Sequence, residues 1–396
     1  MIEELRMTSL RFLFLSILKL GASAYGGPGM ISQIKETAID RYGWVKEGEF
    51  MRGVALCQLI PGAIMVHIVT YIGYRVRGIW GALTAAVAFV LPAFVALLAL
   101  SAIYFKFHGL WFMESLFRGL GAIVIAILLN ACITFGKSVL KDWKVIVISV
   151  FSFFAFLFHL NIVLIFVLAA VAGLLLRPET VQTKALPPGG PRRETGEENP
   201  RLILLALAAC IAVVLGLCYL IDPRIAHVSL SLSKIGAVAF GAFTAIPLIQ
   251  HDMVDRLHWL TTKELLDGIA LGCVTPGPIM ITATFVGYKV AGFLGASMAT
   301  LGVFFPSFFI LVLLIPYHDR LRGVAKVQMM EQGVLGSFIG ILALVLYNFG
   351  RTSLVDVPSI LMASGAFIAI YKKMISLPYI LLVGVILSII FWGLLK

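Results

Sequence analysis

The chain has 396 residues, of which 60% are apolar and 13% are charged, and its formal net charge is +11. Soluble domains carry about a quarter charged residues, so this composition excludes an ordinary soluble domain and predicts a membrane protein. The basic residues are spread through short loops. That distribution argues against nucleic-acid binding and fits positively charged loops and an anionic substrate.

Six apolar segments are predicted in the first half of the chain, residues 1–177. Apolar runs of about 18 or more residues are long enough to cross a bilayer as helices. The segments are Leu10–Tyr25, Phe50–Gly73, Ile79–Tyr104, Ser115–Phe135, Val145–Phe158 and Ile162–Leu176.

Residues 178–229 are predicted to join the two halves. They contain a linker with the sequences PPGGP and RRETGEEN, a composition typical of flexible, solvated chain. One further apolar segment, Leu202–Ile221, follows the linker.

The second half, residues 230–396, again holds six predicted segments: Leu230–Gln250, Leu265–Gly287, Phe293–Pro316, Met329–Leu346, Ile360–Tyr371 and Leu377–Leu394. Together these segments predict an all-α, polytopic membrane protein with about 13 transmembrane segments.

The two halves repeat one sequence pattern. Cys57–Phe94 returns as Gly272–Phe308, and Trp44 and Trp259 match at an offset of 215 residues. Matched tryptophan, proline and charged positions at a fixed offset are not expected from apolar composition alone. The chain is therefore predicted to be duplicated, as in many secondary transporters.

Seven predicted segments separate the starts of the two halves, and because seven is odd, the halves are predicted to have opposite topology. Lys and Arg residues outside the segments favour a cytoplasmic N-terminus. An alternative stays open: Phe50–Gly73 and Leu265–Gly287 could be re-entrant hairpins, which would make the halves parallel. The loop charges favour crossing segments.

The Pro-Gly pairs are the main candidate for a binding site. A proline breaks a helix, and lipid cannot satisfy the freed backbone groups, so such breaks are buried or face a cavity. The half-helix that follows offers N–H groups and a positive dipole end to an anion. The alternative is a packing kink, which we expect at Pro92 and Pro306. The candidate residues here are Gln58, Pro61, Gly62, Thr275, Pro276, Gly277 and Pro278.

Gly26, Gly27 and Pro28 end the first segment with consecutive helix breakers. They are predicted to form either an unwound stretch facing a cavity or a simple exit turn.

Three basic residues fall within predicted segments: Lys19, its repeat counterpart Lys234, and Arg52. Charge at membrane depth usually faces a cavity or a partner, so these residues are candidate substrate ligands. The alternative for the lysines is that their side chains extend to the membrane interface. Arg52 aligns with Asp267, and the two could instead form an ion pair.

Glu49 and Glu264 begin matched segments and are predicted to cap helices, although they could also carry protons. With Asp267 they are the candidates for proton coupling. The histidines and the five cysteines show no metal-ligand spacing, so no metal site is predicted. No nucleotide-binding motif is present, so no cofactor or ATP drive is expected.

At these motifs the chain resembles the chromate ion transporter family. The resemblance rests on GGP at Gly26–Pro28, LIPG at Leu59–Gly62, TPGP at Thr275–Pro278, YIGYRVRG at Tyr71–Gly78 and FVGYKVAGFLGA at Phe285–Ala296. It implies two fused, oppositely oriented halves.

The resemblance also implies a function. It implies export of chromate through the cytoplasmic membrane of a prokaryote, with chromate resistance as the result. A transporter or exchanger for sulfate or other anions is the alternative, and a homodimer is possible.

Overall fold

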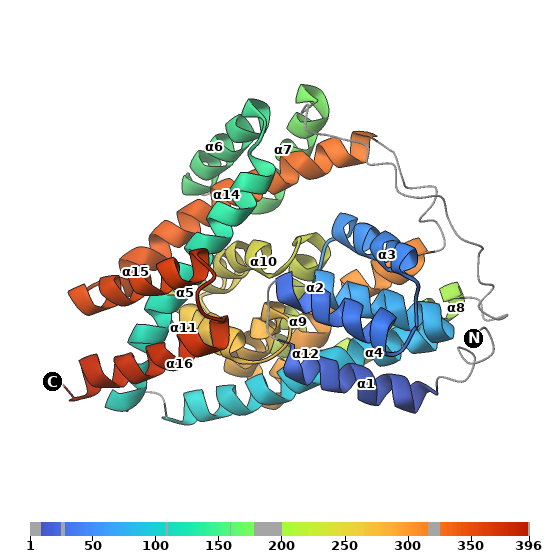
Figure 1. The fold of residues 1–396 in the computed structure, drawn as a ribbon, viewed down its shortest axis with the longest axis horizontal. Coiled ribbons are helices and arrows are strands. Elements are labelled where there is room, and N and C mark those ends of the chain that lie inside the picture. Colours follow the sequence, from blue (N-terminus) through green and yellow to red (C-terminus); the bar gives the residue numbers. More distant parts are fainter. Residues whose placement is uncertain are drawn as a thin grey trace. The chain divides into compact units, whose positions relative to one another are not determined.

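The computed structural model describes residues 9–24, 28–107, 110–158, 160–177, 200–315 and 325–394, and these residues are almost entirely helical (Figure 1). The predicted linker lies largely outside them. In chain order the helices are α1 (Leu10–Ser23), α2 (Pro28–Lys35), η2 (Glu36–Arg41), α3 (Glu47–Leu59), α4 (Ile64–Phe107), α5 (Trp111–Val139), α6 (Trp143–Leu157), α7 (Ile162–Leu176), α8 (Pro200–Ile221), α9 (Pro223–Val238), α10 (Ala242–Ile249), η3 (Gln250–Arg256), α11 (Thr262–Val274), η4 (Ile279–Ile281), α12 (Thr282–Leu314), α14 (Ala325–Ser353), α15 (Val357–Tyr371), α16 (Leu377–Ser388) and η6 (Ile389–Leu394).

The predicted all-α membrane architecture is confirmed. Within the described residues, five helical stretches are long and apolar enough to cross a membrane: Ile64–Phe107, Trp111–Val139, Leu202–Ile221, Ile279–Leu314 and Gln328–Ser353. Four further apolar helices are shorter, so the number of thirteen crossings stays a prediction.

The chain forms two compact units, and each takes segments from both sequence halves. The first unit consists of Met1–Ile103, Leu186–Ala242 and Leu271–Arg322. The second consists of Tyr104–Ala185, Phe243–Ala270 and Gly323–Lys396.

Small residues allow close helix packing in the first unit. A Cβ atom on Gly21 of α1 would collide with the carbonyl of Phe89 in α4, and one on Gly236 of α9 would collide with the carbonyl of Val303 in α12. These two contacts are repeat counterparts. Glycine lets membrane helices approach until their backbones touch, which compensates for the absence of a hydrophobic driving force within lipid.

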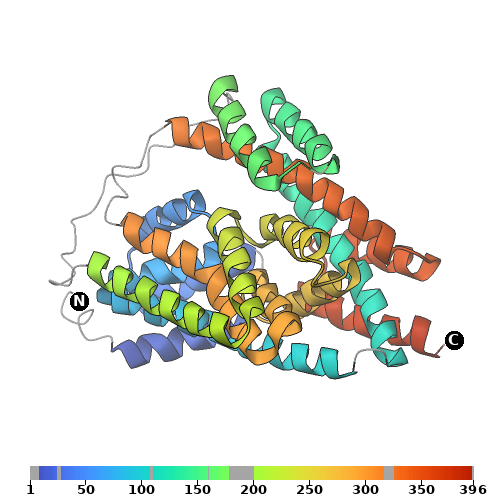
Figure 2. The same ribbon diagram turned by 180° about the vertical axis from the view of Figure 1, so that it is seen from behind.

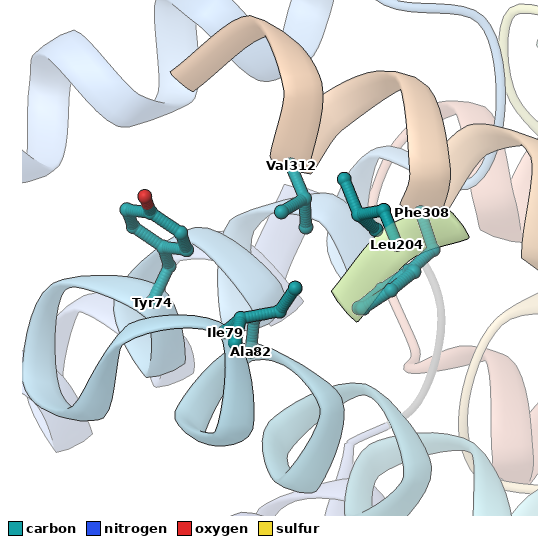
Figure 3. Packing of buried hydrophobic residues seen from close by; sticks show 6 residues of the cluster. All are labelled: Tyr74, Ile79, Ala82, Leu204, Phe308 and Val312. Carbon is teal, nitrogen blue, oxygen red and sulfur yellow. The ribbon is translucent and has the colours of Figure 1, made fainter. Parts of the chain in front are cut away.

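An apolar cluster joins α8 to the two long helices of the first unit. Figure 3 shows side chains from α4, α8 and α12 directed toward one another, and Figure 2 shows α8 alongside α12. The buried members are Tyr74, Ile79, Ala82, Leu204, Phe308 and Val312. The extra segment of the sequence is therefore packed into the first unit.

In the second unit, α6 and α7 lie along α14 (Figure 1). Gly173 of α7 meets Gly333 of α14, and Gly340 of α14 meets the backbone of Ser149 in α6. Helix α5 packs against α15 and α16, where Ser388 Oγ accepts a 3.0 Å hydrogen bond from the backbone N–H of Gly119. Close packing through small residues thus organises this unit too.

The first part of α4 folds back on the second. Arg77 and Gly78 leave the helical conformation, with Gly78 at φ 61° and ψ −148°. Gly73 and Gly81 then touch backbone to backbone, which residues eight apart in one straight helix cannot do. The repeat counterparts of this turn are Ala291 and Gly292 in α12.

The predicted crossing of Phe50–Gly73 is wrong. Glu49, at the start of α3, forms an ion pair with Arg75, and a Cβ atom on Gly53 would collide with the ring of Tyr71. A helix continuing through the break would separate residues 49 and 75 by about 39 Å. Helix α3 and the first part of α4 therefore form a re-entrant hairpin whose tip is the Pro-Gly pair.

The second half repeats this hairpin. A Cβ atom on Gly272 in α11 would lie 2.6 Å from Oγ1 of Thr282 in α12, and these residues flank Gly277 symmetrically. The chain thus also turns back at the second Pro-Gly pair.

The first segment also turns back, which the sequence analysis did not predict. The rings of Phe12, in α1, and Tyr42, just after η2, lie 5.3 Å apart. Residues expected to be a loop form α2 and η2 and return alongside α1. If the first segment and Phe50–Gly73 both turn back, five of the seven predicted segments remain to cross the membrane between the starts of the two halves. Five is odd, so the predicted opposite topology is retained.

We predict measurable coupling between the two arms of the first hairpin. In a double-mutant cycle, Glu49→Gln and Arg75→Gln should show an interaction energy of about 0.5–2 kcal/mol, because they remove one shared ion pair. Unfolding of the purified protein in mixed detergents measures it. The same cycle between Glu49 and Arg224, which pairs with Asp222, should give a value near zero. No coupling between Glu49 and Arg75 would contradict the hairpin.

Candidate functional site

Each hairpin tip forms backbone hydrogen bonds with a helix break of the other half, within the first unit. The N–H of Gly62 donates to the carbonyl of Ala239 at 2.5 Å, and the N–H of Gly241 donates to the carbonyl of Gly62 at 2.9 Å. The N–H of Gly277 donates to the carbonyl of Ala24 at 2.7 Å. Gly62 and Gly277 are repeat counterparts, as are Ala24 and Ala239, so one contact is made twice. Each joins a tip of one half to a break in the other.

Glycine is required at both tips by the backbone conformation. Gly62 has φ 125° and Gly277 has φ 105°, values that residues with a Cβ atom rarely adopt. The preceding prolines, Pro61 and Pro276, cannot continue the hydrogen bonding of α3 and α11. The Pro-Gly pair therefore ends one helix and reverses the chain within two residues.

Each tip is also crowded by the long helix of the opposite half. A Cβ atom on Gly62 would lie 2.6 Å from Oγ of Ser307, and one on Gly277 would lie 2.9 Å from Cβ of Ala93. Ser307 and Ala93 directly follow Pro306 and Pro92. The two later prolines, interpreted from sequence as packing kinks, thus lie beside the tips. Pro92 and Pro306 match in the repeat, and this match is the sequence signal that could have placed both prolines at the tips.

New helices start directly after the tips. Helix α4 begins at Ile64, and after the second tip the short η4 leads into α12. The first N–H groups of a helix have no partner within it, and the helix dipole makes that end positive. Each tip therefore presents backbone donors suited to an anion.

The structure gathers the predicted Pro-Gly residues at the tips. Pro61 and Gly62 form one, and Thr275, Pro276, Gly277 and Pro278 form the other. The hydroxyl of Thr275 is buried and donates to the carbonyl of Gly272 at 3.0 Å, so it is engaged within its own hairpin. Gln58 is exposed. Gly26 and Gly27 lie outside the described residues, and Pro28 begins α2.

The two predicted lysines lie near the breaks that the tips contact. Lys19 and Lys234 are exposed on α1 and α9, five residues before Ala24 and Ala239. Five residues correspond to about 7.5 Å along a helix, within reach of a lysine side chain. Arg52 is half-buried on α3.

Two of the predicted carboxylates lie in the second unit. Glu264 accepts hydrogen bonds from the N–H of Thr261 at 2.8 Å and from its hydroxyl at 3.1 Å, so it caps α11 as predicted. Asp267, one turn later, is 3% exposed and accepts a 2.7 Å hydrogen bond from the hydroxyl of Tyr104. The pairing of Asp267 with Arg52 stays a prediction.

The chain matches the chromate transporter family over residues 12–174 and 226–389. It is 33% identical to an uncharacterised transporter of Methanocaldococcus jannaschii over 96% of this chain and 92% of that protein. It is 31% identical to a chromate transport protein of Cupriavidus metallidurans, covering 92% and 89% of the two chains. A chromate transport protein of Pseudomonas aeruginosa is 30% identical, with 90% and 85% covered. No solved structure matches.

We predict that the tips tolerate no side chain. Gly62→Ala and Gly277→Ala should each lower the free energy of unfolding by about 1–3 kcal/mol, because each adds backbone strain and a steric overlap. Unfolding of the purified protein in detergent measures it. Gly48→Ala in the first turn of α3 is the control, since no atom lies within 4 Å of its Cβ position. Equal stability of all three variants would show that the tips are not tightly packed.

Proposed function

Because the chain belongs to the chromate transporter family, we propose that it exports chromate across the cytoplasmic membrane of a prokaryote by alternating access and so confers chromate resistance. The observation that carries the proposal is the twofold meeting of Pro-Gly tips with breaks in the opposite half. Secondary transporters with repeated halves typically bind their substrate at discontinuous helices between the repeats.

Chromate is a tetrahedral dianion, and we assign its binding to the tips. The N-termini of the half-helices after Pro61-Gly62 and Pro276-Gly277 donate backbone N–H groups to its oxygens. Thr275, Pro278, Gln58 and the Gly26-Gly27-Pro28 stretch complete the predicted lining. Lys19, Arg52 and Lys234 supply the positive field that balances two negative charges.

Alternating access follows from how the halves are joined at the tips. The contacts include two backbone hydrogen bonds at the first tip and one at the second, each worth only about 0.5–1.5 kcal/mol net. Substrate binding can therefore shift such contacts between two arrangements. A dianion that leaves a negative-inside cell moves downhill by about 2.3 kcal/mol per charge per 100 mV, so export needs no further energy source at low outside concentration.

Proton coupling, where it operates, is assigned to Asp267. Glu264 caps α11, and Glu49 pairs with Arg75, so both carboxylates already have structural partners. Asp267 is deeply buried and contacts a neutral hydroxyl, that of Tyr104. A buried carboxylate with a neutral partner can gain and lose a proton without breaking an ion pair.

We predict that the basic residues support flux. In inverted membrane vesicles, Lys19→Ala, Arg52→Ala and Lys234→Ala should each reduce saturable chromate uptake by about tenfold or more, because each removes a charge-assisted contact. Arg224→Ala, in an exposed pair with Asp222, is the control and should match the wild type. Excess sulfate should compete weakly with chromate. Strong inhibition of chromate uptake by excess sulfate would indicate a general anion exchanger. Chromate flux that is unchanged in all three variants would contradict the basic site.

We predict that Asp267→Asn lowers the stimulation of chromate flux by an imposed pH gradient, because the amide cannot carry a proton. Tyr104→Phe is the matched control, since it removes the hydrogen bond but keeps the carboxylate and should keep the stimulation. Flux is measured in proteoliposomes with and without the gradient. An unchanged response in Asp267→Asn would exclude this residue as the coupling group.

A further inference from the structure

We propose that His67 is the side-chain ligand of the oxyanion at the first tip, where it binds the anion as an imidazolium so that one proton is bound with each anion. The inference rests on the proposed function and deepens it. The sequence analysis assigned no role to this histidine.

His67 is buried beside the tip. It lies in the first turn of α4, four residues after Ala63, and is 1% exposed. Its Nε2 atom lies 2.7 Å from the position that a Cβ atom on Gly62 would occupy, next to Oγ of Ser307. The ring is therefore directed at the tip.

Neither ring nitrogen of His67 has a partner in good hydrogen-bond geometry among the described residues, and the backbone of Cys57 makes at most a loose contact with the ring. A buried polar group without a partner costs about 1–3 kcal/mol, and native structures retain few of them. A histidine that serves packing alone normally bonds at least one nitrogen. The unsatisfied nitrogens are thus explained by a ligand that reaches the ring when the closely packed tip opens during transport.

The second tip has no equivalent group. Counted from the tips, His67 corresponds to Thr282, whose hydroxyl donates to the carbonyl of Ile279 at 2.8 Å. The second half is one residue shorter between its tip and Gly287, and the neighbouring position, Ile281, is apolar. The two tips share their backbone geometry and differ in this side chain. Only the first can add a protonatable donor to its backbone N–H groups.

The described groups that face His67 carry no negative charge. From α3 the backbone of Cys57 faces the ring, and Ser307 of α12 faces it as a hydroxyl. The break at Ala239 and Phe240 contributes backbone and apolar groups. The negative charge that would stabilise an imidazolium is therefore supplied by the bound oxyanion, so proton and anion bind together.

Calorimetric titration of the purified full chain tests the proposal. Sulfate is the probe for counting protons, because chromate itself takes up a proton near neutral pH, and chromate is titrated in parallel. Titrations in two buffers of different ionisation enthalpy give the protons bound per anion. The wild type should bind about one, and its affinity should fall about tenfold per pH unit above neutrality.

His67→Gln keeps an N–H donor but cannot be protonated. It should bind the anion without proton uptake, with an affinity that changes less than about twofold across the same pH range. His227→Gln is the control: this histidine is exposed on α9 against Tyr219, and its variant should behave as the wild type.

The outcomes separate the two levels of the proposal. A wild type that binds neither anion would overturn the proposed function. A wild type that binds chromate and sulfate without taking up a proton would overturn the role of His67 alone, whatever the variants do. Proton uptake that persists in His67→Gln would also overturn it.

Discussion

The satisfaction of backbone groups inside a bilayer governs the rest of this structure. Lipid offers no hydrogen bonds, so a chain that breaks its helices at membrane depth has to pair the freed groups within the protein. Here the tips do so across the repeat: Gly62 pairs with Ala239 and Gly241, and Gly277 pairs with Ala24. The two tips and the two breaks satisfy one another's backbone groups, because lipid could not satisfy any of them alone.

This pairing explains why small residues recur along the flanking helices. The tips can meet only if α1 and α9 lie directly against α4 and α12, and Gly21 and Gly236 allow that approach. The turns at Gly78 and Gly292 then return the chain so that the later prolines stand opposite the tips of the other half. Glycine and proline positions in both halves thus serve one geometric purpose.

Duplication gives the tips a common backbone, and later substitution has made them chemically different. A symmetric pair of helix N-termini attracts an anion but cannot link its binding to another ion. The imidazole of His67 on one side and the hydroxyl of Thr282 on the other break that symmetry. Positions that differ between the two halves are therefore expected to serve function, whereas the positions that they share maintain the fold.

The sequence by itself determined the membrane class, the repeat and the Pro-Gly breaks, because apolar run length and matched helix breakers are local properties of the chain. It also indicated that Glu264 caps a helix, since capping depends on neighbours three residues away. It did not determine that Phe50–Gly73 turns back, that Phe12 meets Tyr42, or that His67 faces Gly62. Those facts depend on contacts between segments distant in sequence. A helix that crosses and a hairpin that re-enters share one hydropathy pattern, and only the packing of Glu49 against Arg75 and of each tip against a break in the other half distinguishes them.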